Sequence, residues 1–269
     1  KIIEKSIIST ETPEITLPRV IQFFKSFSNQ LTSMGIGAFG PVDLHPSSPH
    51  YGKITHTPKL AWRNFNLLQA LQSEFNIPMV FDTDVNAAAL GEYTWGAAQN
   101  ISHFLYITVG TGIGVGGMIN HELMHGLTHP EMGHILIPGS SQDISNFKGI
   151  CPYHGNCLEG LASGTALNAR WGVSSSQNLE KNHIAWEIES DHLAQALMNY
   201  TLICSPQKII MGGGVMHQQQ LFPMIQKKLK ALLNGYVQHP TILENIVSPK
   251  LKDNAGSLGA IALAMKTKS

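Results

Sequence analysis

The chain alternates between continuously apolar runs and amphipathic segments, and this alternation predicts strands and helices in turn. Short apolar runs predict buried strands over residues 34–44, 77–82, 104–109 and 208–211. Apolar residues at helical spacing predict helices over residues 12–31, 64–75, 84–98, 190–202, 218–233 and 255–266. Strands that alternate with helices are typical of an α/β architecture. The first set of elements ends near residue 100, which is the clearest internal boundary.

Composition and charge narrow the class of protein. The 269 residues are 43% apolar and 13% charged, and their formal net charge is zero, so nothing indicates disorder or a nucleic-acid partner. No apolar run approaches the roughly 20 residues of a membrane span, and the first residues lack the apolar core of a signal peptide. Three cysteines argue against a disulfide scaffold, which favours the reducing cytoplasm as the default compartment.

Two of the cysteines belong to a pattern of metal ligands. Cys151, His154 and Cys157 follow one another at two-residue gaps, which lets a tight knuckle present soft ligands to one zinc ion. His134 is the fourth candidate, which would close a tetrahedral structural site. Three further histidines upstream compete with it, namely His121, His125 and His129.

Three glycine-rich turns indicate a place where backbone comes close to a ligand or to another segment. Residues 110–117 carry alternate glycines after a strand, and they match neither the Gly-Lys-Ser/Thr phosphate loop nor the dinucleotide fingerprint. The run 211–215 also follows a strand, and a third turn lies at 162–165. Each alone is a weak signal, but together they are typical of a nucleotide cradle.

Acidic residues are the candidates for a general base and for contacts with a substrate. Asp82, Asp84 and Asn86 stand at a strand-to-helix junction, where a carboxylate can be a general base or an ordinary helix cap. Glu131 and Glu159 flank the metal ligands. Carboxylates beside an imidazole suit the hydroxyls of a sugar, and the alternative is that they are surface acids.

In combination these segments resemble the ROK family of sugar kinases and transcriptional repressors. The matching stretches are residues 82–92, 108–117, 131–134, 151–164 and 211–215, which cover nearly the whole chain in the family's order. The form Cys-Pro-Tyr-His-Gly-Asn-Cys, with residues 57–62 and 37–41, is similar to the fructokinase branch.

The resemblance implies a fold and a set of roles. The expected fold is the two-lobed, actin-like ATPase fold (ribonuclease H-like), with a smaller lobe in residues 1–100 and a larger lobe in residues 101–269 that carries the zinc loop. The last helix would pack back on the small lobe. Asp84 would be the general base that takes the proton of the sugar 6-hydroxyl, and the product would be fructose 6-phosphate. Sugar contacts would come from Thr83, Glu131, His134 and Glu159, with His134 serving both metal and sugar.

The resemblance also implies the nucleotide and metal partners. ATP would be bound with Mg²⁺ bridging its phosphates, beside a structural Zn²⁺, in a homodimer. The nucleotide pocket would be lined by Gly110, Thr111, Gly112, Thr165, Gly212, Gly213, Gly214, Val215 and Met216.

The sequence departs from the family pattern at defined places. Family members begin with a strand and a Gly-Gly-Thr-Lys phosphate loop, and this sequence starts after that point. Thr165 stands where proline is expected, and Thr83 stands where glucose-type members often carry asparagine. Three alternatives stay open: a kinase for mannose, glucose or allose, a sugar-sensing repressor of the ROK type, and a zinc-stabilised binding protein without catalysis.

Overall fold

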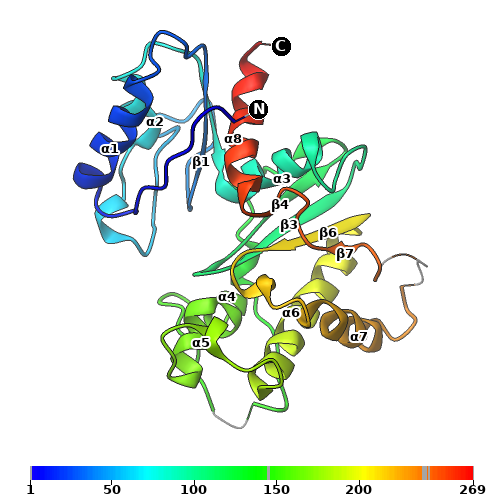
Figure 1. Cartoon of the computed structure of the whole chain (residues 1–269). Coiled ribbons are helices and arrows are strands. Elements are labelled where there is room, and N and C mark those ends of the chain that lie inside the picture. The colour runs from blue at the N-terminus through cyan, green and yellow to red at the C-terminus, as the bar shows by residue number, and fades with distance from the viewer. Residues whose placement is uncertain (1, 144–145, 238–240, 242, 269) are drawn as a thin grey trace.

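In the described part of the chain, helices pack against two β-sheets (Figure 1). The computed structural model describes residues 2–143, 146–237, 241 and 243–268. The smaller sheet pairs β1 (Met34–Ala38) with β2 (Met79–Thr83) in parallel. Helices α1 (Pro13–Lys25) and α2 (Leu67–Gln72) share an apolar core with this sheet.

The larger sheet has five strands in the order β5-β4-β3-β6-β7. Strands β3 and β4 form an antiparallel hairpin, whereas β6 lies parallel to both β3 and β7. The bounds are β3 (Phe104–Val109), β4 (Ile113–Ile119), β5 (Glu122–Leu123), β6 (Lys208–Gly212) and β7 (Ile246–Val247). A hairpin followed by a parallel crossover brings the glycine turns after β3 and β6 to the same edge of the sheet.

Strand β3 is buried on both faces, which explains its continuous apolar run. Leu105, Ile107 and Val109 belong to one core cluster, and Phe104 and Tyr106 belong to another. This period of two is the side-chain alternation of an extended strand. Each fully buried side chain of this size contributes about 1.5–3 kcal/mol through burial.

Helices cover both faces of the larger sheet. The first cluster includes side chains of α4, α6 and α7, and the second includes those of α3 and α8. Their bounds are α3 (Asp84–Trp95), α4 (Leu158–Ala162), α5 (Gly164–Trp171), α6 (Ile184–Cys204), α7 (Leu221–Leu233) and α8 (Ala255–Met265). Within the described part of the chain, none of the helices combines the length and the apolar character needed to cross a membrane.

Glycines allow α3 to lie against both α8 and β4. A Cβ atom at Gly259 of α8 would stand 1.6 Å from the Ala87 carbonyl oxygen, and one at Gly116 of β4 would stand 2.8 Å from the Asn86 amide nitrogen. Gly116 therefore lies against the backbone of α3, whereas a Cβ atom at Gly114 would meet the Val85 side chain at 2.7 Å.

Several elements differ in extent from the sequence-based prediction. The first helix ends at Lys25 instead of residue 31, because the polar run after it forms turns. Strand β1 ends at Ala38, before the Gly40-Pro41 bond, and not at residue 44. Helix α6 begins at Ile184, six residues before the predicted start. The α/β class, β3 and β6 agree with the prediction.

Candidate functional site

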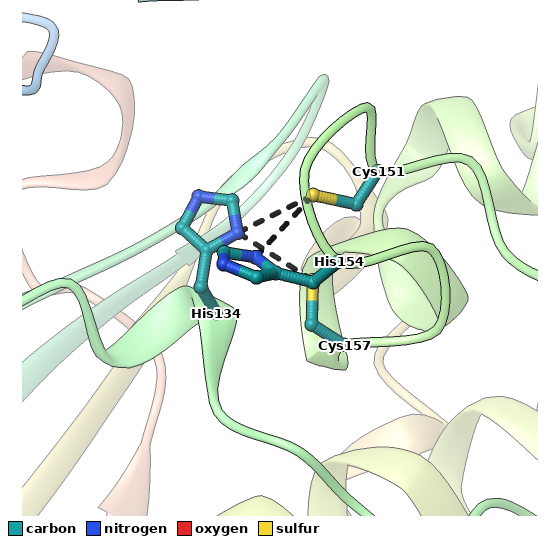
Figure 2. A group of neighbouring side chains, drawn as sticks. All are labelled: His134, Cys151, His154 and Cys157. Carbon is teal, nitrogen blue, oxygen red and sulfur yellow. Dashed lines mark hydrogen bonds between the residues drawn. The ribbon is translucent and has the colours of Figure 1, made fainter. Parts of the chain in front are cut away.

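The four predicted metal ligands lie together between a short 3₁₀ turn and the start of α4 (Figure 2). Their ligand atoms all lie within 4.8 Å of one another. His134 ends the turn Met132–His134, and Cys157 is the residue before α4. The knuckle is closed by paired backbone bonds between Cys151 and Gly155.

The spacing of the donor atoms fits a tetrahedral zinc ion. Nδ1 of His134 lies 3.6 Å from Sγ of Cys151 and 3.5 Å from Sγ of Cys157. Nδ1 of His154 lies 3.7 Å from Sγ of Cys151. Zn–S bonds of about 2.3 Å and Zn–N bonds of about 2.0–2.1 Å in a tetrahedron place S and N about 3.5–3.6 Å apart. Burial raises the pKa of the Cys157 thiol to about 11, so a cation is needed to hold this sulfur as a thiolate at neutral pH.

The other upstream histidines have different partners. His121 contacts the Tyr93 hydroxyl at 3.0 Å, and His125 contacts the Asp82 carboxylate at 2.9 Å. His129 accepts the Val42 amide at 3.0 Å. Of these four histidines, the metal cluster contains His134 alone.

Two carboxylates at the junction of β2 and α3 have different hydrogen-bond partners. Asp82 is buried and accepts bonds from the Thr83 amide and the Asn86 side chain. Thr83 caps α3 by accepting the Asn86 amide at 3.1 Å. Asp84 is therefore neither the cap nor part of the buried network, and its carboxylate accepts the adjacent Val85 amide at 2.8 Å.

Asp84 faces a cavity of about 310 Å³ that is also lined by Gly37 of β1 and Gly256 of α8. Although water reaches the side chain, the surrounding walls displace enough solvent to raise the pKa of the Asp84 carboxyl above its ordinary value. The Val85 amide and the Lys59 ammonium oppose this effect. The position at the start of α3 also favours the ionised form.

Glu131 precedes the turn that ends at His134, and Glu159 lies on α4 directly after Cys157. Glu159 of α4 places Oε1 3.8 Å from Nε2 of His134, so this histidine presents Nδ1 to the cluster and Nε2 to a carboxylate. Burial, helped by the charges of Glu159 and Asp84, raises the pKa of Glu131 to about 7. Three carboxylates thus lie within electrostatic range of one another.

The three glycine-rich turns converge. The Gly164 amide donates to the Gly110 carbonyl, and the Thr165 hydroxyl donates to the Thr111 carbonyl at 2.7 Å. A Cβ atom at Gly110 would stand 3.9 Å from the Gly214 amide nitrogen. Gly213 has φ of +92°, and a Cβ there would stand 2.4 Å from the Val109 carbonyl oxygen, so this turn needs glycine.

A cavity of about 540 Å³ opens beside the turn after β6 and is lined by Gly212, Gly213 and Met216. Gly256 lines this cavity as well as the one at Asp84, so the two adjoin. Lys252 and Asp253 also line it, and no sequence pattern predicted a role for either residue. Both precede α8, a helix that only the folded chain brings to the turn after β6.

The chain has an α/β fold of the actin-like ATPase class. The structure is similar to that of a ROK family glucokinase from Streptomyces griseus in complex with glucose and AMPPNP, with a TM-score of 0.74 and 24% identity. The likeness covers 97% of this chain and 90% of the other. The ROK family model matches residues 1–267, and the chain belongs to the ROK family.

Two relatives are similar over nearly the whole chain. A fructokinase from Pediococcus pentosaceus is 42% identical over 96% of this chain and 88% of its own length. A fructokinase from Streptococcus mutans is 40% identical over 99% of this chain and 90% of its own length. The chain also has the fold of the sugar kinases in this family, as the resemblance in its motifs implied.

Proposed function

We propose that the protein is an ATP-dependent fructokinase that transfers the γ-phosphoryl group of ATP to the 6-hydroxyl of D-fructose. The similarity to two fructokinases at 40–42% identity over nearly the full chain supports this substrate. The geometry supports a kinase because the glycine turns, the carboxylates and the metal cluster adjoin one another.

The observation that carries the proposal is the position of Glu159. One carboxylate oxygen accepts the Ile113 amide at 2.9 Å, directly after the first glycine turn. The other oxygen faces Nε2 of His134, whose Nδ1 lies in the metal cluster. A single side chain therefore joins the proposed nucleotide, sugar and zinc regions, as a reaction between ATP and a sugar requires.

The proposed mechanism uses Asp84 as the general base. Its carboxylate accepts the proton of the 6-hydroxyl while that oxygen forms a bond to the γ-phosphorus, and the bond from this phosphorus to the bridging oxygen of ADP breaks. Glu131, Glu159 and Nε2 of His134 bind other sugar hydroxyls. The Thr83 oxygen accepts the Asn86 amide, and in this proposal its hydroxyl hydrogen is the group that contacts the sugar.

The nucleotide lies against the three converging turns, which are formed by residues 110–112, Thr165 and residues 212–216. Their amides and the small residues at them allow the phosphates to approach the backbone. Mg²⁺ would neutralise the phosphate charge, and Zn²⁺ at the His/Cys cluster would fix the loop that carries His134.

An assay of the full-length protein tests the substrate. ADP release is coupled to a reporter reaction, and D-fructose, mannose, glucose and allose are compared at saturating ATP. We expect the highest kcat/KM with D-fructose and expect phosphoglucose isomerase with glucose-6-phosphate dehydrogenase to detect fructose 6-phosphate. A higher kcat/KM with another hexose would move the proposal to that sugar, and inactivity with all four would reject it.

The proposal also includes the arrangement of the lobes, the oligomeric state and the cellular compartment. Residues 1–100 and 101–269 form two lobes around the cleft, with α8 packing on the smaller one. The protein is a homodimer in the cytoplasm, where the thiols of the metal cluster stay reduced. Sedimentation equilibrium at several concentrations tests the dimer.

A further inference from the structure

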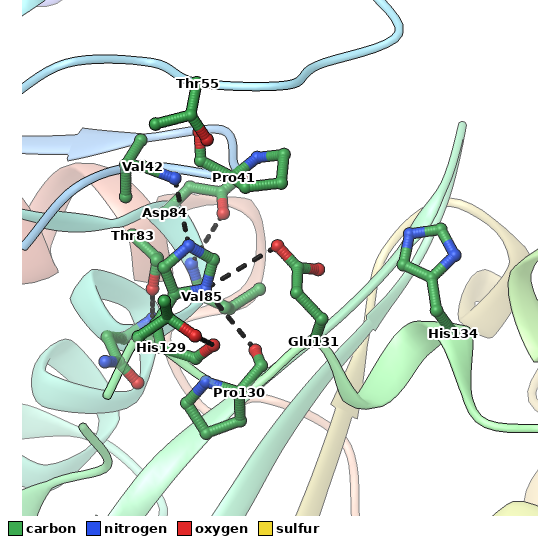
Figure 3. Close-up of polar contacts among 12 residues, drawn as sticks. Pro41, Val42, Thr55, Thr83, Asp84, Val85, His129, Pro130, Glu131 and His134 are labelled. Carbon is green, nitrogen blue, oxygen red and sulfur yellow. Dashed lines mark hydrogen bonds and ion pairs between the residues drawn. The ribbon is translucent and has the colours of Figure 1, made fainter. Parts of the chain in front are cut away.

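His129 joins two segments of the chain that are far apart in sequence (Figure 3). Its side chain is 6% exposed, and its Nε2 accepts the Val42 amide at 3.0 Å. An acceptor at Nε2 places the hydrogen of the neutral ring on Nδ1. Burial lowers the pKa of His129, which favours this neutral form.

The protonated edge of the ring is turned toward Glu131. Nδ1 lies 3.6 Å from Oε1 of Glu131 and 3.5 Å from the Pro130 carbonyl oxygen. The N–H group at Nδ1 donates to the Pro130 carbonyl and lies beside Oε1 of Glu131, so its positive end is close to the carboxylate that is proposed to bind sugar. A Cβ atom at Gly40 would stand 3.1 Å from Cε1 of His129 and 3.2 Å from Oε1 of Glu131.

The segment on the other side of the imidazole is itself anchored. The Pro41 carbonyl accepts both the amide and the hydroxyl of Thr55, at 2.8 and 3.1 Å. Val42 is 3% exposed and belongs to the core shared by β1 and β2. His129 thus connects a fixed backbone to a carboxylate whose side chain is 44% exposed.

We infer that His129 is a positioning residue for fructose binding, which orients the Glu131 carboxylate through Nδ1 while Nε2 anchors the ring to Val42. This inference rests on the proposed function, in which Glu131 binds sugar hydroxyls. His129 sets sugar affinity without touching the sugar, and it ties the backbone after β1 to the sugar-binding wall.

Two substitutions test the contributions of the two ring nitrogen atoms of His129 separately. Glutamine places its terminal amide near the position of Nε2, so His129→Gln keeps an acceptor for Val42 and loses the donor that faces Glu131. Asparagine places its amide near the position of Nδ1, so His129→Asn keeps that donor and loses the anchor to Val42. His50→Leu, on an exposed loop, is the control for loss of an imidazole.

The experiment measures KM for fructose, KM for ATP, kcat and melting temperature in the full-length enzyme. We expect His129→Gln to melt like the wild type and to raise the fructose KM roughly five- to tenfold, because a misplaced hydrogen-bonding partner weakens binding by about this factor. Its ATP KM should change less than twofold. We expect His129→Asn to melt at a lower temperature with a fructose KM near that of the wild type.

Glu131→Gln separates this inference from the proposed function. If Glu131→Gln leaves the fructose KM unchanged, the proposed sugar contact of Glu131 is wrong. If Glu131→Gln raises that KM while His129→Gln does not, the inference alone is wrong. In the double variant His129→Gln/Glu131→Gln, we expect the fructose KM of Glu131→Gln alone, and additive effects would show that His129 does not act through Glu131.

Discussion

At the scale of single residues, neighbouring groups of the same type have different environments. Asp82 and Asp84 are two positions apart, yet Asp82 is 3% exposed and is bonded to His125 and Asn86, whereas Asp84 faces a cavity. Because the walls of the cavity displace solvent, the pKa of the Asp84 carboxyl lies above its ordinary value. Sequence spacing alone favoured a helix cap for this junction, and the structure assigns the cap to Thr83.

Asp84→Asn tests the proposed base. Asparagine keeps the shape of the side chain but cannot take a proton, so we expect kcat to fall by ~100-fold or more while sugar binding changes little. Steady-state kinetics with titration of fructose binding measure both quantities. Asp43→Asn, on the loop after β1, is the control, and wild-type turnover in Asp84→Asn would contradict the assignment.

The pH dependence of stability tests the environment of Glu131. Its pKa is about 7 in the folded protein against an ordinary value of 4.5, so the folded state holds a proton that the unfolded chain has lost between these values. The stability that this proton supplies is complete below pH 4.5 and is lost as pH rises through about 7. Because the side chain is 44% exposed, solvent reduces the effect below the full size of the pKa shift.

Glu131→Gln should therefore raise the melting temperature relative to the wild type at pH 8 but not at pH 4.5. Differential scanning calorimetry of both proteins across this range measures the difference. A difference that is independent of pH would show that Glu131 ionises in the folded protein as it does in the unfolded chain.

At the scale of elements, the close approach of α3 and α8 depends on missing side chains. Ala262 and Leu263 of α8 share a core with Ala87–Leu90 of α3, and the carbonyl oxygen of Ala87 occupies the place of a Cβ at Gly259. The sequence predicted a helix over residues 255–266, but not that α3 is its partner.

Two glycines of α8 provide a matched pair. Gly259→Ala adds a methyl group against backbone, which cannot move away easily, so we expect a loss of about 2 kcal/mol or more in the free energy of unfolding. Gly256→Ala adds the same group where nothing lies within 4 Å, and we expect no loss and a gain of up to about 1 kcal/mol from helix propensity. Urea denaturation of both variants measures the difference, and equal effects would contradict this packing.

At the scale of the whole molecule, the sequence predicted local features well and long-range ones poorly. Residues 104–109 were placed correctly because a strand buried on both faces is a continuous apolar run. Helix α6 was begun too late because its first turns carry Glu187 and Glu189, and Glu189 is charged in sequence yet fully buried in the fold. The Cys-x2-His-x2-Cys spacing is local and was readable, whereas His129 meets Val42 across 87 positions and left no pattern.

The metal cluster joins two segments that are apart in the sequence. It links the turn with Glu131 and His134 to the start of α4, where Glu159 lies. We expect one Zn²⁺ per chain in the purified protein. Removing it with a chelator should lower the melting temperature by roughly 5 °C or more, since a metal that binds only the folded state stabilises it. The fructose KM should rise in the same samples, because His134 and Glu159 lose their fixed positions.

Cys157→Ser should reproduce both effects, and Cys204→Ser, outside the cluster, should not. A chelated protein that has lost its zinc but keeps its melting temperature and fructose KM would show that the cluster has no structural role in sugar binding.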